Sequence, residues 1–260
     1  MTVQTIDDVV SALDEIVQHS YDNASRLGYF AALYRRVTCA VRDGLNSGQF
    51  QNGPLLEKLD VVFASRYLDA LATYQAGGTA TRSWMLAFHG CDDASLLILQ
   101  QLLSGMNAHI NLDLGIAAAQ VSPGVQLPQI KTDFDQINAL LAGLVGSVEA
   151  EIASLSPLIG DLEKLGLRTE TSVVNFSMQA ARDHAWIVAQ HLAREPANLH
   201  DATVGTLDVA VFVGGEAILH PLVSGVGLQL IQQAEVKDVR RVIEVLSQPA
   251  TSAAQAASAT

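Results

Sequence analysis

Apolar residues recur at intervals of three and four through most of this chain, a pattern typical of amphipathic helices. The first predicted helix covers about residues 6–17, and Thr5 and Asp8 have the spacing of a capping box at its start. Another is expected from Pro54 to about Tyr74, because proline is tolerated in a first helical turn. The same spacing predicts further helices over residues 23–45, 84–88, 95–117, 133–152, 158–166 and 169–193, and two or three more between 203 and 247.

The stretch "NAHINLDL", residues 107–114, instead alternates polar and apolar positions, as a β-strand does. Helix-forming residues flank it on both sides, in "SLLILQQLLSGM" and "GIAAAQ", and only one of the eight residues is β-branched. A lone strand without neighbours would also leave its backbone groups unpaired in the core. We therefore predict that these residues belong to a buried central helix over residues 95–117.

Together these elements predict an all-α fold, a single-domain bundle of about nine helices over residues 1–248. "VAVFVGG" (209–215) resembles a buried strand but has no evident partner strand. "QVSPGVQLPQIK" (120–131) contains two prolines and is expected to be an ordered surface loop, with Thr132 or Asp133 capping the helix that follows. The tail, residues 249–260, is rich in Ala, Ser and Thr and is expected to be disordered.

Composition narrows the classes of function. Of the 260 residues 49% are hydrophobic, which is enough for a sizeable core, and the net charge of −12 argues against nucleic acid or an anionic membrane as partner. Two isolated cysteines, no signal-peptide layout at the N-terminus and no run of 18 apolar residues predict a cytoplasmic protein that does not span a membrane. The apolar content is also compatible with a homodimer.

The predicted central helix carries four polar residues. Because residues four apart lie about 40° apart around a helix axis, His109 and Asp113 share one face, and Asn107 and Asn111 share nearly the opposite face. Unpaired buried polar groups cost about 1–3 kcal/mol each, so all four residues need partners.

Other predicted helices also direct charged groups inward. Arg66 falls within the apolar stripe of the helix from Pro54, with Asp60 and Tyr67 at its margin. In the helix over 169–193, His184 lies on the apolar face and Arg182 lies just off it. Since buried charges need opposite charges or metals, these groups could form one polar pocket inside the bundle.

The leading interpretation is a metal-assisted hydrolase or lyase acting on a small metabolite. His109, Asp113 and Asp60 would be the catalytic residues and the ligands of a divalent metal ion, which could polarise an oxygen or activate water. The substrate would be bound by a second set of residues: Arg66, Tyr67, Asn107, Asn111, Arg182 and His184. Two alternatives stay open. One is a non-catalytic small-molecule binding or interaction protein whose polar cluster is structural. The other is a metal-free enzyme in which His109 acts as general base and pairs with Asp113, which orients it.

Known catalytic signatures are missing from the sequence. It contains no HExxH, P-loop, GxSxG or nucleotide-binding glycine motif, and no pair of Glu-x-x-His motifs for a di-iron bundle. Asn175, Gln179 and Asp183 have the spacing of a terpene-cyclase metal triad, but Gln is a poor magnesium ligand. A terpene-cyclase-like lyase is therefore a more distant alternative.

Four segments resemble the signature blocks of an uncharacterised bacterial domain family of similar length. They are "SRLGYFAALYRRVT", "LDVVFASRYLDAL", "GMNAHINLDLGIAAA" and "FSMQAARDHAW". The resemblance covers about residues 15–245 and implies a single domain. It supplies no activity, cofactor or substrate.

Overall fold

The computed structural model describes residues 2–159, 177–221 and 226–249. Over these ranges the chain is all helical and contains no strand, which confirms the predicted all-α class. The first half contains α1 (Ile6–Asp22), α2 (Leu27–Asn46), α3 (Gly53–Gln75), α4 (Arg82–Gly90), α5 (Ile98–Met106), η1 (Asn107–Leu114) and α6 (Gly115–Val121). The second half contains η2 (Gly124–Ile130), α7 (Lys131–Leu155), α8 (Met178–Leu192), η4 (Ala197–Leu199), α9 (His200–Leu219), α10 (Val226–Ala234) and α11 (Val239–Leu246).

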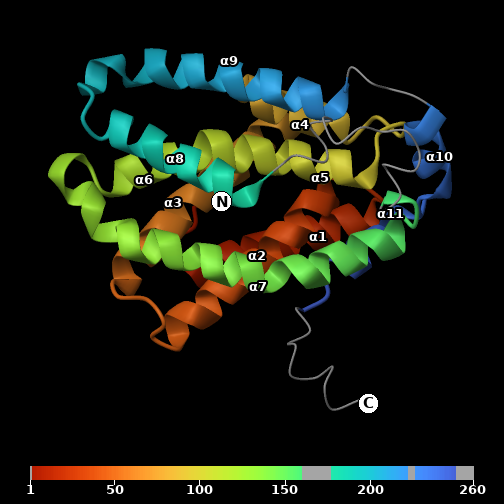
Figure 1. Ribbon diagram of the computed structural model, residues 1–260, viewed down its shortest axis with the longest axis horizontal. Helices are drawn as coiled ribbons and strands as arrows, with labels where there is room; N and C mark the ends of the chain where they lie inside the picture. The colour runs from red at the N-terminus through yellow and green to blue at the C-terminus, as the bar shows by residue number, and fades with distance from the viewer. Residues whose placement is uncertain (1, 160–176, 222–225, 250–260) are drawn as a thin grey trace.

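A continuous rod, α5–η1–α6, runs through the middle of the bundle (Figure 1). In Figure 1 it lies between α8 and α9 above and α2, α3 and α7 below, and η1 contacts α3, α4, α8 and α9. Seven of the eight η1 residues are buried, as expected for a central helix. The stretch that alternates like a strand is a π-helix, a rare form that occurs mostly as short insertions at functional sites.

Close approach to the central rod depends on glycine. A Cβ atom added to Gly115 would lie 2.7 Å from the backbone oxygen of Ala185, so α6 and α8 meet at van der Waals distance only without a side chain there. A Cβ on Gly105 would lie 2.8 Å from the ring of Phe30. Both glycines therefore let neighbouring elements pack directly on this rod.

Several helix ends are capped by side chains from distant parts of the chain. Both oxygens of Asp208 in α9 accept hydrogen bonds from the first backbone N–H groups of α4, at Arg82 and Ser83. Asp133 was expected to cap its own helix, but α7 begins earlier, at Lys131. The Asp133 carboxylate accepts from the backbone N–H groups of residues 51 and 52 instead and fixes the start of α3.

Other boundaries differ from the sequence-based expectations. The second helix begins at Leu27 instead of residue 23, because Ala24 adopts a left-handed conformation with φ 49° that separates α1 from α2. The expected loop over 120–131 contains the 3-10 helix η2, which buries Leu127 and Ile130. "VAVFVGG" is helical, as part of α9. The helix predicted over 158–166, the first part of the one over 169–193 and the predicted tail lie almost entirely outside the described residues.

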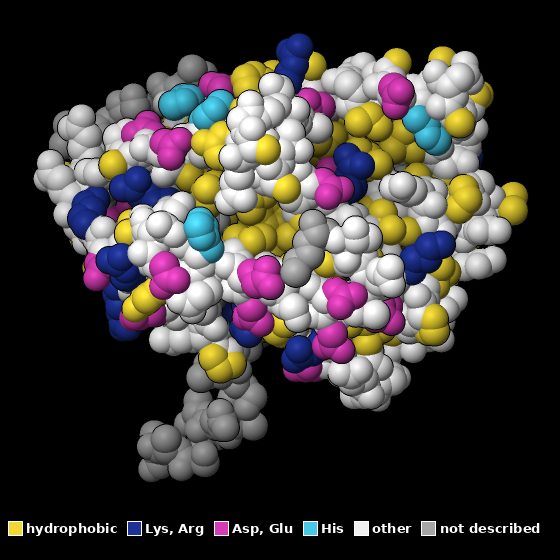
Figure 2. Space-filling view, turned by 180° about the vertical axis from the view of Figure 1, so that it is seen from behind, with side chains coloured by type: hydrophobic (Ala, Val, Ile, Leu, Met, Phe, Trp, Pro, Cys, Tyr) yellow, Lys and Arg dark blue, Asp and Glu magenta, His cyan; other side chains and the backbone are white. Residues whose placement is uncertain are grey.

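Two helical segments are strongly apolar, Gly124–Leu155 and Ala197–Leu219, and each contains an 18-residue window whose mean hydropathy is 1.3 and 1.5, respectively. By length and composition alone they could cross a membrane, a test that helices of soluble proteins also pass. Only 11% and 28% of these windows is buried, so α7 and α9 expose apolar surface. On the opposite side of the molecule, acidic and basic side chains are scattered and apolar side chains show in hollows between them (Figure 2). Cellular location and oligomeric state stay predictions.

Candidate functional site

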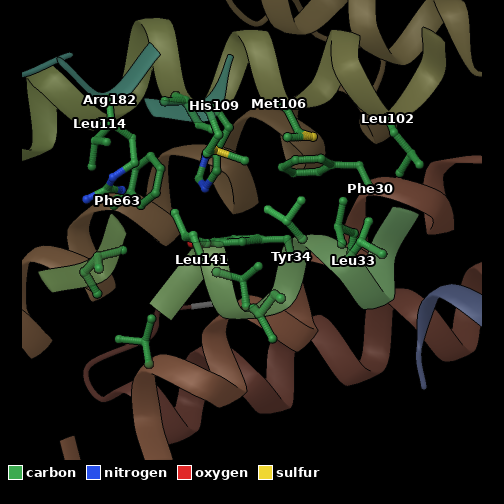
Figure 3. A pocket seen from close by; sticks show the side chains of 18 of the residues that line it. Phe30, Leu33, Tyr34, Phe63, Leu102, Met106, His109, Leu114, Leu141 and Arg182 are labelled. Atoms are coloured by element: carbon green, nitrogen blue, oxygen red, sulfur yellow. The ribbon is translucent and has the colours of Figure 1, made fainter. Parts of the chain in front are cut away.

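A cavity of about 300 Å³ lies between α2, α3, the α5–η1–α6 rod and α7 (Figure 3). Its walls are mainly Leu, Ile, Val, Phe and Met side chains. The labelled side chains in Figure 3 extend from Arg182 and Leu114 at one end to Leu33 and Leu102 at the other. Val145 of α7 is exposed and also lines the cavity, so the cavity reaches the protein surface at this residue. Large apolar pockets with a few convergent polar groups are the usual form of small-molecule sites.

His109 projects from η1 into the middle of this cavity (Figure 3). Its ring stacks on Phe63 with a centroid distance of 3.6 Å and meets the edge of Tyr34 at 4.3 Å. Neither ring nitrogen has a hydrogen-bond partner among the described residues. Burial, assisted by the positive charge of Arg66, holds the pKa of His109 well below its usual value. The imidazole is therefore neutral and presents one donor and one acceptor.

Two further polar groups on the cavity wall lack partners within the described part of the chain. They are the hydroxyl of Tyr34 on α2 and Oδ2 of Asp60 on α3. Burial, reinforced by the nearby Glu57, raises the pKa of Asp60 to about 7. Burial also raises the pKa of Tyr34, and the charge of Asp60 adds to that effect. His109, Tyr34 and Asp60, which come from three helices, thus line one apolar cavity, and each of their unpaired polar atoms costs about 1–3 kcal/mol.

Asp113 does not form the expected pair with His109. Its Oδ1 accepts from Nε of Arg66 at 2.7 Å, and its Oδ2 accepts from Nε1 of Trp84 at 2.7 Å. Burial raises the pKa of Asp113, while Arg66 and Trp84 act in the opposite direction. Because both oxygens are occupied by these donors, the carboxylate joins η1 to α3 and α4 instead of orienting the imidazole.

The predicted metal ligands do not converge. Within the described ranges no group of three or more His, Cys, Asp or Glu side chains lies close enough to hold a metal ion. His109 and Asp60 both line the cavity, but Asp113 does not. The metal site therefore stays a prediction, and this arrangement gives it no support.

The predicted substrate-binding residues are distributed over several places. Asn107 donates from Nδ2 to the carbonyl of Val211 in α9 at 2.8 Å and accepts from Nδ2 of Asn111 at 3.0 Å. These amides therefore join η1 to α9. Tyr67 is buried among aromatic rings, 5.1 Å from those of Phe30 and Trp84.

On α8, Arg182 is buried and lines the cavity, whereas His184 is exposed. The structure does not bring the nine candidates together in one polar pocket: of these nine, His109, Asp60 and Arg182 line this cavity and the other six do not. Of the residues considered for a terpene-cyclase triad, Asn175 lies outside the described residues, and Gln179 and Asp183 are exposed on α8.

Sequence reasoning missed Tyr34 and Phe63, which flank His109 in the cavity. Both occupy apolar helix stripes, where an aromatic residue is typical of an ordinary core position. No local signal distinguishes them, because their role depends on the cavity left where four helices meet.

The comparisons with curated proteins and with solved structures return no match. A family model of unknown function, DUF5995, matches residues 6–221. That range includes η1 and the helices that form the cavity, with the described part of α8 among them. The resemblance to an uncharacterised domain family is confirmed at this level, and the chain belongs to DUF5995, a family of unknown function.

Proposed function

We propose that this protein binds a small, mainly apolar molecule with at least one oxygen function in the cavity between α2, α3, the central rod and α7. One observation carries the proposal: His109, Tyr34 and Asp60, whose polar groups have no partner among the described residues, all line the same apolar cavity. Native proteins satisfy nearly all buried polar groups, and each exception calls for an explanation, such as a catalytic role or a bound water or ion. We attribute the exceptions around this cavity to a bound ligand. A hydroxyl or carbonyl oxygen of the ligand would supply the missing hydrogen bonds.

The cavity volume limits the size of the ligand. Since a water molecule occupies about 30 Å³ of liquid, 300 Å³ corresponds to a molecule of about ten to fifteen non-hydrogen atoms. This is the lower end of the range of small-molecule sites. Burial of such a molecule against Leu, Ile and Phe side chains would supply most of the affinity, and the polar groups would fix its orientation.

Calorimetric titration of the purified chain with 1-decanol tests the proposal. We expect saturable binding to the native protein and an affinity at least fivefold lower in His109→Phe, which keeps an aromatic ring but removes both nitrogens. His184→Phe is the matched control, because that histidine is exposed on α8, and its affinity should equal that of the native protein. Absence of saturable binding to the native protein would refute the proposal.

A second candidate is a metal-free acid–base enzyme that uses the same cavity. The supporting observation is that the neutral imidazole of His109 and the Asp60 carboxyl group, whose pKa is raised to about 7, line one pocket; a carboxyl group with a pKa near neutrality suits proton transfer. Hydrolysis of p-nitrophenyl acetate and p-nitrophenyl butyrate, which stay within the size limit set by the cavity, provides a first assay. Activity that is insensitive to chelator and lost in both His109→Phe and Asp60→Asn would favour this function over simple binding.

The metal-assisted enzyme is tested separately. Elemental analysis of protein purified without chelator, for the native chain and His109→Ala, determines whether a divalent metal is bound through this histidine. A stoichiometric metal that is present in the native protein and lost in His109→Ala would support the predicted metal ligands, His109, Asp113 and Asp60.

A further inference from the structure

Arg182 is a buried cation with no carboxylate partner among the described residues. It is 5% exposed, and its guanidinium donates to neutral acceptors: Nε to Oδ1 of Asn138 at 2.5 Å, and Nη2 to the carbonyl of Phe134 at 2.7 Å. The guanidinium also stacks on the Phe134 ring, 4.5 Å from its centroid. Within the described ranges, no acceptor is found for its third nitrogen, Nη1.

Other inward-facing arginines are paired differently. Arg36, equally buried, contacts Glu151 at 2.6 Å, and Arg66 contacts Asp113 at 2.7 Å. Burial of a charge without an opposite charge is expensive, and proteins usually avoid it. The environment of Arg182 therefore differs from that of a structural arginine in this same fold.

Electrostatics supports the same distinction. Burial lowers the pKa of Arg182 to about 10, with Asp135 and Asp183 acting against that change from a distance. Neither carboxylate comes within 4.0 Å of the guanidinium, and Asp135 is paired with Lys131. The side chain still carries a full positive charge at neutral pH.

The position of Arg182 indicates what would neutralise this charge. It lines the cavity proposed as the ligand site, and Figure 3 shows its guanidinium beside Phe63 and Leu114, at the end opposite Leu33 and Leu102. Apolar side chains of α2, α5 and α7 line most of the remaining space; Asp60, whose pKa is raised to about 7, and the exposed Glu149 of α7 are the acidic residues of the lining. An elongated apolar space with a cation at one end complements an amphiphilic anion.

We infer that the ligand is a medium-chain carboxylate, whose head group binds Arg182 and whose chain runs along the cavity past His109 toward Leu102. This inference rests on the proposed function and specifies its ligand class. The guanidinium suits a carboxylate because its planar donors match the two oxygens. The neutral groups near the middle of the cavity, His109 and Tyr34, then bind an oxygen function on the chain where one is present.

Titration with three probes of equal chain length, below their micellar concentrations, tests the inference: decanoate, 1-decanol and decyltrimethylammonium. We expect decanoate to bind the native protein at least tenfold more tightly than 1-decanol, and the cation to bind most weakly. In Arg182→Met, the affinity for decanoate should fall at least tenfold while that for 1-decanol changes less than twofold. Arg182→Lys should restore part of the loss, and the exposed Arg194 provides the matched control, Arg194→Met.

The outcomes separate the two proposals. Equal affinity of the native protein for decanoate and 1-decanol would overturn the carboxylate inference and leave the apolar site standing. Absence of binding by every probe would refute the proposed function itself. If Arg182→Met fails to fold, as judged by its circular dichroism melt, the comparison of probes on the native protein still decides the inference.

Discussion

Replacement of His109 by Phe separates a functional histidine from a structural one. If a histidine stabilises the fold, its replacement should lower the free energy of unfolding. Here both ring nitrogens are buried and without partners in the described part of the molecule, while the ring itself stacks on Phe63. Phe keeps that aromatic stacking and removes the two unpaired polar atoms.

The magnitude follows from these contacts. An unpaired buried donor or acceptor costs about 1–3 kcal/mol, so removal of two such atoms could yield several kcal/mol. Part of this gain is offset because Phe is larger, and overpacking costs about 1–3 kcal/mol where no space exists. The adjacent 300 Å³ cavity provides space, so we expect a net stabilisation of about 2 kcal/mol.

Thermal and urea unfolding of ligand-free protein at pH 7.5 measure this difference. For a chain of this size, about 2 kcal/mol corresponds to a rise in Tm of roughly 4–8 °C. His184→Phe on the exposed face of α8 should change the free energy of unfolding by less than about 0.5 kcal/mol. A loss of 1 kcal/mol or more in His109→Phe would show that the imidazole stabilises the fold, and would refute the reasoning.

Three further predictions concern stability. Asp113→Asn should lower the free energy of unfolding by about 3–5 kcal/mol in urea denaturation, because it breaks a buried ion pair and turns an amide toward the donors of Arg66 or Trp84. A loss below about 1 kcal/mol would contradict the role of Asp113 in joining η1 to α3 and α4. Asp60 binds its proton more tightly in the folded than in the unfolded chain, so its contribution is fully present below about pH 4 and is lost as the pH rises toward 7. The Tm of Asp60→Asn should therefore exceed that of the native protein at pH 8 by more than at pH 5, and equal differences at both values would be evidence against a raised pKa. Gly115→Ala should lower the free energy of unfolding by about 1–3 kcal/mol, because the added Cβ meets the α8 backbone. Gly143→Ala, which has open space around it, should be neutral or stabilising by up to about 1 kcal/mol. Similar urea unfolding curves for the two variants would mean that α6 and α8 are less closely packed than described.

Local periodicity was sufficient to predict the helices that contain the site. The spacing of apolar residues predicted α3 to within one residue at each end and α1 at its start, although α1 continues to Asp22 instead of ending near residue 17. Composition around "NAHINLDL" correctly favoured a helix over a strand. Its π form was not predicted, because the helix-forming composition around this stretch distinguishes a helix from a strand but not a π-helix from an α-helix. The left-handed Ala24 that delays α2 has no distinctive sequence signal either.

The candidate site was predictable only in part. The polar residues that the sequence places on or beside apolar stripes include His109, Asp60 and Arg182, all of which line the cavity. Which of the predicted polar residues pair with each other, and which stay unpaired, could not be predicted from the sequence, because pairing depends on which helices meet. Asp113 was assigned to His109 by spacing along one helix, yet Arg66 and Trp84 of two other helices bind it.

The sequence by itself determined that this protein is an all-helical bundle with a central apolar helix that carries polar groups. These properties follow from residue periodicity, which acts over one or two helical turns. Only the tertiary structure decided which of those polar groups find a hydrogen-bond partner and which lie unpaired beside the cavity. Whether a polar group is satisfied depends on atoms far away along the chain, such as the carbonyl of Val211, to which Asn107 donates across 104 residues. The cavity itself belongs to no single element, because it is the volume that α2, α3, the central rod and α7 leave unfilled between them.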